Sequence, residues 1–348
     1  MTAVRAAIVV VNYNGGALVE DAVRSALAQD VRAGAEAAFP VVVVDNVSSD
    51  GSADRLDAAF GDRITLIRSH ENTGYAGGNN LAFARFPQAE AFALLNPDAI
   101  AAPGWLAALL SSAGRHPDWG AIASHIDNAA APGVLDNVGH RMALDGTVRG
   151  RGRGEADHGQ YGGERALMIA SGCALLLRGD AVRAAGGFDD SFFCYCDDVE
   201  LCLRLNLLGY QTWYAPDARV AHHFSAAAGV AFNAFKAYHV ERNRYWVIAK
   251  CFPWPAVPVA LGASVVRYAW ASIATARGRG PGARLAATAG FKETSRTILR
   301  AHRDALLGLP AVLRRRAEEA PRRKLGTLEF LKRWRRDYLP MKVAVSLE

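Results

Sequence analysis

Two oxygen-bearing side chains follow a short apolar run in this sequence, and their spacing suits a metal ion. Leu94 and Leu95 are followed by Asn96, Pro97 and Asp98, so an amide and a carboxylate lie two residues apart. Both can point towards one hard cation such as Mg²⁺ or Mn²⁺. Such a cation would neutralise a departing nucleoside diphosphate, whose own oxygens supply further ligands. Taken alone, the same residues also suit a simple Asx-Pro turn.

Two other apolar runs end in polar side chains, at places where ligands bind in open α/β sheets. Asn12 and Asn14 follow the first run, and Asp45 and Asn46 follow the second. The Asp45 carboxylate can accept a hydrogen bond from the edge of a base. The alternative is a helix cap, because the Ser and Asp residues that come next favour the start of a helix.

A glycine-rich segment, residues 72–80, leads into a helical pattern. Near Gly74 and Gly78 the backbone N–H groups can approach a diphosphate closely, with Asn79 beside them. The segment lacks the G-x-G-x-x-G order and follows the third expected strand instead of the first. A dinucleotide-binding fold is therefore not expected.

A cluster of acidic residues precedes and opens another helical pattern. Asp189 and Asp190 come first, and Asp197, Asp198 and Glu200 follow within a few positions. Acidic residues at a helix start interact favourably with the helix dipole, but capping needs only one of them. Crowding of Asp197 against Asp198 would raise one pKa, as a general base requires.

The pair His222 and His223 follows a strand-like run at residues 218–221. A neutral imidazole at this place would complete the shell of a metal ion. A structural role for a buried histidine is the alternative that the sequence leaves open.

Apolar runs and helical patterns alternate along the first half of the chain. Strands are expected at residues 6–11, 41–44, 64–67, 91–95 and 121–124, and helices at 17–29, 52–60, 77–86 and 105–115. The alternation predicts an α/β fold with a parallel sheet covered by helices on both faces. Polar residues that follow the strands should then meet at the carboxyl edge of the sheet, where ligands bind.

The second half begins with a segment of different composition. Residues 127–164 are rich in Gly, Ala and Arg and are expected to form a long, mobile excursion. Regular structure should resume at residues 167–177, followed by a helix at 197–208 and a strand near 211–214.

Residues 253–348 differ from residues 1–252 in composition and charge. They are expected to form a separate helical region that serves membrane association or oligomerisation, with a homo-oligomer as one expected assembly. Residues 256–276 contain Arg267 as their only charge and are long enough to span a bilayer. Residues 277–348 carry a net charge of +11, against −5 for residues 1–276. This combination favours peripheral attachment to an anionic membrane surface, with a single span as the alternative. The adjacent apolar stretch argues against a nucleic-acid partner.

Composition bounds these interpretations. The chain has 348 residues, of which 51% are hydrophobic, so it can bury a large core and is not disordered. Its five cysteines form no regular framework, as expected where thiols stay reduced. Residues 1–7 show none of the features of a secretory signal. We therefore expect a cytoplasmic protein on the inner face of the membrane.

Several motifs, taken in order, resemble those of family 2 glycosyltransferases, especially the rhamnosyltransferase-like branch. They are VVNYNG, VVVDNVSSDGS, NTGYAGGNN, LLNPD, SGCALLLRGDAVRAAGGFDDSFF, DDVELCLRLNLLGY and PDARVAHHFSAAAG, and they cover roughly residues 6–253. The resemblance implies an α/β GT-A fold, with a mixed sheet flanked by helices, a divalent metal and inversion at the anomeric carbon. It also implies a nucleotide-diphosphate sugar donor of the dTDP or UDP type and a saccharide or lipid-linked acceptor in cell-surface polysaccharide synthesis.

The resemblance assigns roles to individual residues. Asp45 corresponds to the family aspartate that contacts the nucleobase, with Asn14 beside the nucleoside. Asp98 corresponds to the last acidic residue of the D-x-D metal motif, in which Asn96 replaces the first aspartate. Asp198 corresponds to the catalytic base.

Three further positions match the family motifs less closely. Asp197 stands where glutamate is more usual, which leaves the choice of base between Asp197 and Asp198 open. Glu200 matches a further acidic position, on the acceptor side with Asp189 and Asp190. Either His222 or His223 matches the metal-binding histidine.

Two other functions compete with sugar transfer. A non-catalytic module that binds nucleotide sugars at the membrane would have lost the catalytic residues, whereas this sequence keeps the residue types that catalysis requires at every site named above. A nucleotidyltransferase would need a basic, glycine-rich triphosphate loop after the first strand, which this sequence lacks.

Overall fold

The computed structural model describes residues 3–29, 37–223, 233–278 and 280–346. The chain forms two compact units. The first contains Met1–His140, Gly150–Phe193 and Asp197–Gly229, and the second contains Arg141–Arg149, Cys194–Cys196 and Val230–Glu348.

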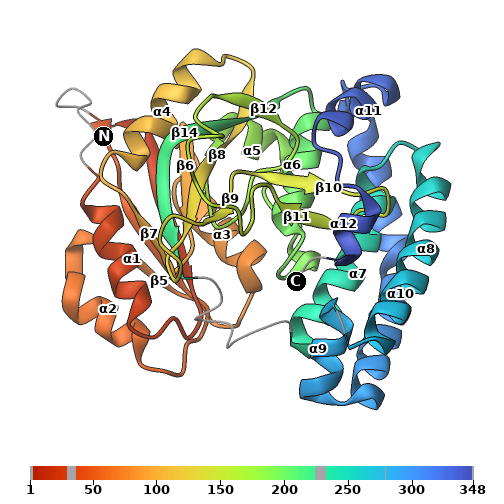
Figure 1. Cartoon of the computed structure of the whole chain (residues 1–348). Helices are drawn as coiled ribbons and strands as arrows, with labels where there is room; N and C mark the ends of the chain where they lie inside the picture. Colours follow the sequence, from red (N-terminus) through yellow and green to blue (C-terminus); the bar gives the residue numbers. More distant parts are fainter. Residues whose placement is uncertain (1–2, 30–36, 224–232, 279, 347–348) are drawn as a thin grey trace. The chain divides into compact units, whose positions relative to one another are not determined.

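One half of the main sheet is parallel. Strands β6 (Ala91–Leu95), β2 (Ala6–Asn12), β4 (Val41–Asp45) and β5 (Thr65–Arg68) lie in this order (Figure 1). The residues of β2, β4 and β6 are buried throughout, as expected for strands covered on both faces. These strands confirm the sequence-based prediction, and their carboxyl ends bring Asn12, Asp45 and Asn96 to one edge.

Four helices connect the strands of the first unit and pack their apolar faces on the sheet. They are α1 (Leu18–Leu27), α2 (Ser52–Phe60), α3 (Gly74–Arg85) and α4 (Trp105–Arg115). The core buries Val19 and Val23 of α1, Leu56 of α2, and Trp105 and Leu106 of α4. The 3.6-residue spacing of such side chains predicted three of the helices closely, whereas α3 begins three residues before the expected start.

The other half of the sheet is mixed. It contains β7 (Ala99–Ala101), β8 (Trp119–Asn128), β9 (Leu135–Asn137), β12 (Arg165–Leu167), β13 (Ala174–Arg178) and β14 (Gln211–His222). Strand β13 is antiparallel to both β6 and β8, while β14 is parallel to β8 and antiparallel to β7. The mixed sheet that the GT-A resemblance implies is therefore confirmed, whereas the parallel direction expected from the apolar runs alone ends at β6, because a buried apolar run does not reveal strand direction.

Helical segments after β13 carry the acidic cluster, and three short elements complete this unit. Helix α5 (Gly179–Ala185), the 3-10 turn η2 (Asp190–Phe192) and helix α6 (Asp197–Leu207) follow β13. The 3-10 turn η1 (Gly61–Arg63) follows α2, and β1 (Ala3–Val4) pairs with β3 (Ala37–Ala38).

The expected excursion at residues 127–164 contains regular structure. It carries β9, and the paired strands β10 (His140–Met142) and β11 (Val148–Gly150). Short strands between glycine-rich turns are difficult to recognise from sequence, because each spans only three residues.

The second unit is mainly helical. It contains α7 (Ala234–Cys251), α8 (Ala256–Ala276), α9 (Gly280–Ala289), α10 (Phe291–Glu319), the turn η3 (Ala320–Arg322), α11 (Thr327–Arg336) and α12 (Met341–Ser346). Helix α7 groups with the other helices, so the compact unit begins before residue 253, the expected start of the C-terminal region. The functional division at residue 252 stays a prediction.

Candidate active site

The carboxyl ends of β2 and β4 hold the side chains expected at the nucleoside. Asn12 is fully buried, and its Nδ2 donates to Asp45 Oδ1 and to Ser52 Oγ, each at 2.8 Å. The backbone N–H of Ser48 donates to Asp45 Oδ2 at 3.1 Å. These bonds fix the direction of the Asp45 carboxylate, which is only 4% exposed. Asn12 therefore positions Asp45 and presents no free amide of its own.

Asn14 and Asn46 have different surroundings at the same edge. Asn14 has a left-handed backbone with φ of 52°, and its Oδ1 accepts from Ser49 N at 2.8 Å. Asn46 is fully buried, and its Nδ2 donates to the Gly74 carbonyl at 2.7 Å. Its Oδ1 accepts from Thr73 Oγ1 at 3.0 Å. Asn46 thus joins the end of β4 to the glycine-rich segment.

The glycines of α3 are required by close packing. A Cβ atom on Gly74, whose φ is 69°, would lie 2.1 Å from the Phe193 carbonyl oxygen. A Cβ on Gly78 would lie 2.6 Å from Val11 Cγ1. Asn79 is 1% exposed, and its amide donates to a carbonyl one turn earlier in the helix. The structure therefore favours a packing role for Gly78 and Asn79 over the donor contact expected from sequence.

Asp98 and His222 face each other across β7 and β14. The antiparallel pairing places Ala99 opposite His222, which brings the preceding Asp98 within reach of the imidazole. His222 Nε2 lies 3.3 Å from Asp98 Oδ1, and His222 Nδ1 lies 2.8 Å from Asp136 Oδ2. All three side chains are less than 10% exposed.

This arrangement favours positive charge at His222. Burial lowers the pKa of His222, but the nearby Cys173 and the carboxylates of Asp136 and Asp98 raise it well above its ordinary range. Burial raises the pKa of Asp136, but the hydrogen bond from His222 and its charge outweigh burial and hold the pKa below its usual range. A divalent cation between Asp98 and His222 would take the place of the proton on Nε2, because a metal binds the neutral imidazole, while Asp136 at Nδ1 would orient the ring.

Asn96 and His223 flank this pair. The Asn96 N–H donates to the Cys173 carbonyl at 2.8 Å, and its carbonyl accepts from Ala99 N, so the residue forms the turn after β6. The backbone N–H of His223 donates to the Asp98 carbonyl at 2.9 Å, while the His223 side chain is exposed. Of the two histidines, the structure brings His222 to Asp98.

Asp197 and Asp198 at the start of α6 differ sharply in their surroundings. Asp197 is 3% exposed, and its Oδ2 has no hydrogen-bond partner among the described residues. Burial, followed by the charge of Asp198, raises the pKa of Asp197 well above its ordinary value. Asp198 is half-buried, and its Oδ2 accepts from Gly172 N at 2.7 Å. A carboxyl group held neutral cannot accept a proton, so this geometry favours Asp198 as the base.

A family model decides the class of enzyme. The model described as "Glycosyl transferase family 2" matches residues 7–180, which is half of the chain. The chain belongs to this family. It is a glycosyltransferase, and its relatives support sugar transfer from a nucleotide sugar in cell-surface polysaccharide synthesis.

Two curated relatives lie in the branch that the motifs indicate. The glycosyltransferase is 29% identical over 209 residues to the N-acetylglucosaminyl-diphospho-decaprenol L-rhamnosyltransferase of Mycobacterium tuberculosis, covering 54% of this chain and 68% of that protein. It is 38% identical over 84 residues to the rhamnosyltransferase WbbL of Escherichia coli, covering 24% of this chain and 26% of that protein.

Solved structures show the fold of the glycosyltransferase. GalNAc-T7, solved with UDP, GalNAc and Mn²⁺, aligns with a TM-score of 0.56 at 13% identity, over 71% of this chain and 48% of that chain. The mannosyltransferase PcManGT of Pyrobaculum calidifontis, in complex with GDP-Man and Mn²⁺, aligns with a TM-score of 0.52 at 20% identity, over 88% and 87%. Both likenesses confirm the expected GT-A class of fold.

The expected acceptor-side residues of the glycosyltransferase do not share one environment. Glu200 is fully buried, and its two oxygens accept from Arg204 Nε and Nη2 at 2.8 and 2.7 Å. This pairing favours a structural role for Glu200 over the expected contact with an acceptor. Asp189 caps η2 by accepting from Ser191 N and Oγ, whereas Asp190 is exposed and accepts from Asn80.

Three further residues of the glycosyltransferase lie around these side chains and were not identified from the sequence. Asp136 orients His222, as described above. Tyr75 donates through its hydroxyl to the Gly172 carbonyl at 2.6 Å, and burial, with the charges of Asp197 and Asp198, raises its pKa. Burial lowers the pKa of His140, which also feels the charge of Asp198. Asp136 and His140 lie outside the motifs, whereas Tyr75 lies within NTGYAGGNN but has no role assigned by it.

Proposed function

We propose that this glycosyltransferase transfers a sugar from a nucleoside diphosphate to an acceptor hydroxyl with inversion at the anomeric carbon. The Asp98–His222 pair carries the proposal, because a carboxylate and an imidazole 3.3 Å apart suit the cation that accompanies a diphosphate. When bound, that cation would be held by Asp98 and His222, with Asp136 behind the imidazole, and would stabilise charge on the departing diphosphate.

Side chains of this chain bind the nucleobase and accept the proton of the acceptor hydroxyl. Asp45, fixed by Asn12, accepts a hydrogen bond from the nucleobase. Asp198 accepts the proton of the acceptor hydroxyl as its oxygen bonds to the anomeric carbon. The bond from that carbon to the diphosphate breaks on the opposite face, and its electron pair leaves with the diphosphate. Asp197, held neutral by burial, keeps a second negative charge away from Asp198.

The donor is a deoxythymidine diphosphate sugar of the rhamnose type, and the acceptor is a saccharide linked to a lipid diphosphate. Support comes from the name of the Mycobacterium tuberculosis relative, which states such an acceptor and L-rhamnose.

Thermal unfolding with Mn²⁺ and a panel of nucleotide sugars tests the donor. At about 100 times Kd a ligand stabilises the folded chain by about 2.7 kcal/mol, so we expect dTDP-rhamnose to raise Tm by several degrees. The variant Asp45→Asn should lose most of this increase, while an exposed control, Asp217→Asn, keeps it. An equal response to every nucleotide, or none to dTDP-rhamnose, contradicts the assignment.

We also propose that the second unit attaches the enzyme to an anionic membrane surface. Among the described residues, α8 is the one helix that is long and apolar enough to cross a membrane. Apart from Ser272, its exposed side chains are apolar, and the large ones are Val259, Leu261, Val265, Val266, Trp270 and Ile273, each 46–71% exposed. Soluble monomers rarely leave so continuous an apolar face in water.

The opposite face of α8 holds the helix to its own unit. Arg267 Nε lies 2.6 Å from Asp145 Oδ2, and Arg267 Nη2 lies 2.8 Å from Glu241 Oε1. A span would have to break these buried ion pairs, which is costly. Peripheral attachment keeps them, so the structure supports it over the single span.

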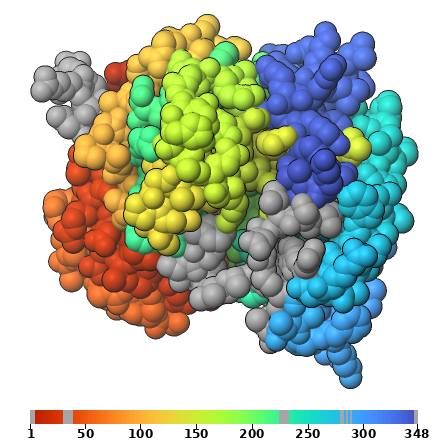
Figure 2. Space-filling view, viewed as in Figure 1, coloured from red at the N-terminus to blue at the C-terminus, as the bar shows by residue number. Residues whose placement is uncertain are grey.

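Helix α10 supplies the matching charge. Phe291, Leu299, Leu306 and Leu307 are 68–74% exposed on this helix. The basic residues Lys292, Arg296, Arg300 and Arg303 lie among them, and Figure 2 shows the blue residues of α10 at the molecular surface. Apolar and cationic side chains together suit a bilayer that contains anionic lipid.

Vesicle sedimentation tests this attachment. We expect binding to vesicles with phosphatidylserine, and weaker binding as salt rises, because added ions screen the arginines. The double variant Val265→Glu with Ile273→Glu should weaken binding about tenfold or more, since each side chain loses over 1 kcal/mol of burial. Leu81→Glu, on α3, is the matched control and should bind normally. Unchanged binding of the double variant would exclude this face of α8.

A further inference from the structure

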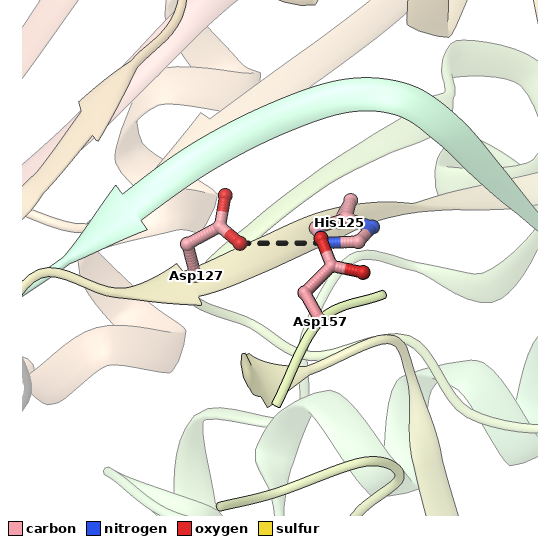
Figure 3. Close-up of side chains that lie close together, drawn as sticks. All are labelled: His125, Asp127 and Asp157. Carbon is pink, nitrogen blue, oxygen red and sulfur yellow. Dashed lines mark ion pairs between the residues drawn. The ribbon is translucent and has the colours of Figure 1, made fainter. Parts of the chain in front are cut away.

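A second cluster of metal-ligand type lies on β8 and is separate from Asp98 and His222. His125 and Asp127 project from the same face of this strand, and Asp157 approaches them from the segment between β11 and β12 (Figure 3). His125 Nε2 lies 3.3 Å from Asp127 Oδ1 and 3.4 Å from Asp157 Oδ2. His125 is 3% exposed, and its Nε2 has no hydrogen-bond partner among the described residues.

The distances fit the edges of a metal polyhedron better than direct hydrogen bonds. Charge-assisted N–H···O bonds are usually about 2.7–2.9 Å long. Ligand atoms around a tetrahedral Zn²⁺, each bound at about 2.0–2.2 Å, lie about 3.3–3.5 Å apart. The two distances from His125 Nε2 fall in or close to this second range.

The other ring nitrogen of His125 is already held in place. His125 Nδ1 lies 2.8 Å from the Tyr214 hydroxyl on the neighbouring strand β14. A hydrogen bond at one imidazole nitrogen commonly orients the other towards a metal. His222 shows the same arrangement, with Nδ1 at 2.8 Å from Asp136 and Nε2 at 3.3 Å from Asp98.

The two histidine clusters lie on opposite faces of the β8–β14 ladder. Asp127 pairs with Ala221, whereas the next residue along, Asn128, pairs with His222. Because successive side chains of a strand point to opposite faces, Asp127 and His222 project in opposite directions. A metal ion at His125 would therefore be a second ion, apart from the one expected at the donor.

Arg219 also contacts the carboxylates of this cluster. Its Nη2 lies 2.8 Å from Asp127 Oδ1 and 2.9 Å from Asp157 Oδ2. Each carboxylate oxygen has two lone pairs, so one can accept from the arginine while the other faces His125 Nε2. The guanidinium leaves one negative charge on the two carboxylates uncompensated, which a cation at Nε2 would neutralise.

We propose that His125, Asp127 and Asp157 bind one divalent transition-metal ion in a structural site. One imidazole and two carboxylates with a water as fourth ligand suit Zn²⁺. The ion fastens the segment that carries Asp157 to β8, beside the strand that presents His222. The proposal is independent of the donor, the acceptor and the catalytic base.

Zinc binding to the full chain in the Asp98→Asn background tests this site, because that substitution weakens the donor-side site. After removal of metals with a chelator, we expect one Zn²⁺ per chain at micromolar affinity and an increase in Tm on binding. X-ray absorption should show one imidazole nitrogen with oxygens at about 2.0–2.2 Å. The added substitution Asp157→Asn should weaken affinity about 100-fold or more, and the exposed control Asp217→Asn should not.

A further variant separates metal binding from a simple ion-pair network. Arg219→Gln should retain one Zn²⁺ per chain, since the arginine is not a ligand. If the Asp98→Asn chain binds no Zn²⁺ at micromolar concentration, or if Asp157→Asn and His125→Asn bind it as well as the parent, the proposal is overturned. The cluster is then an ion-pair network centred on Arg219. Circular dichroism of each metal-free variant confirms that it is folded.

Discussion

Asp198→Asn is expected to lower kcat for sugar transfer about 10²–10⁴-fold while leaving donor affinity almost unchanged. Asparagine cannot accept the proton of the attacking hydroxyl, yet it can keep the hydrogen bond from Gly172 N to the side-chain oxygen. The loss should therefore appear in kcat, with little change in the donor's Kd. Steady-state kinetics together with calorimetric donor binding measure the two quantities separately.

Asp197→Asn is the matched control for this prediction. Burial and the charge of Asp198 hold the pKa of Asp197 high, so its carboxyl is neutral and asparagine resembles it in shape and charge. We expect this variant to keep activity within about tenfold of the parent. If Asp197→Asn abolishes transfer and Asp198→Asn does not, the base has been assigned to the wrong carboxylate.

Asp98→Ala is expected to lower kcat/KM about 10²-fold or more and to remove the response to added Mn²⁺. Metal stabilisation of a departing diphosphate is worth several kcal/mol, and each 1.36 kcal/mol is tenfold in rate. Asn96 stands where the family motif has a second aspartate, so we propose that Asp98 is the principal carboxylate on the metal. Activity measured across a titration of Mn²⁺ gives both the rate and the apparent metal affinity.

The two adjacent histidines provide the control for the Asp98 result. His222→Ala should resemble Asp98→Ala, because the His222 imidazole lies 3.3 Å from the same carboxylate. His223→Ala should keep near-parental kinetics, since that side chain is exposed and only its backbone contacts Asp98. Full metal-dependent activity in Asp98→Ala would refute the metal role of this residue.

The parallel half of the fold and its polar edge were predictable because both depend on local patterns. Buried valine-rich runs indicated β2 and β4, and the residue after each strand identified Asp45 and Asn12 as edge residues. The mixed half was not predictable to the same degree. Strand direction depends on contacts between residues that are distant in the sequence, and the pairing of β7 with β14, which brings Asp98 to His222, joins residues more than 100 positions apart.

The same dependence on contacts between distant residues explains why some site residues could not be predicted from the sequence. Asp136 lies in the glycine-rich segment after β8, where no motif distinguishes it from its neighbours. For Glu200, in contrast, the sequence did contain a sign of its structural role. Arg204 follows four residues later on the same helix, and this spacing is typical of an ion pair, which the buried structure confirms.

Inversion is the central chemical claim, and the anomeric configuration of the product tests it most directly. The full chain, a nucleotide sugar of known configuration, a lipid-linked acceptor and Mn²⁺ are incubated together, and the new glycosidic bond is assigned by NMR. The proposed direct displacement predicts the configuration opposite to that of the donor, and no product after chelation of the metal. A product that retains the donor's configuration would contradict it.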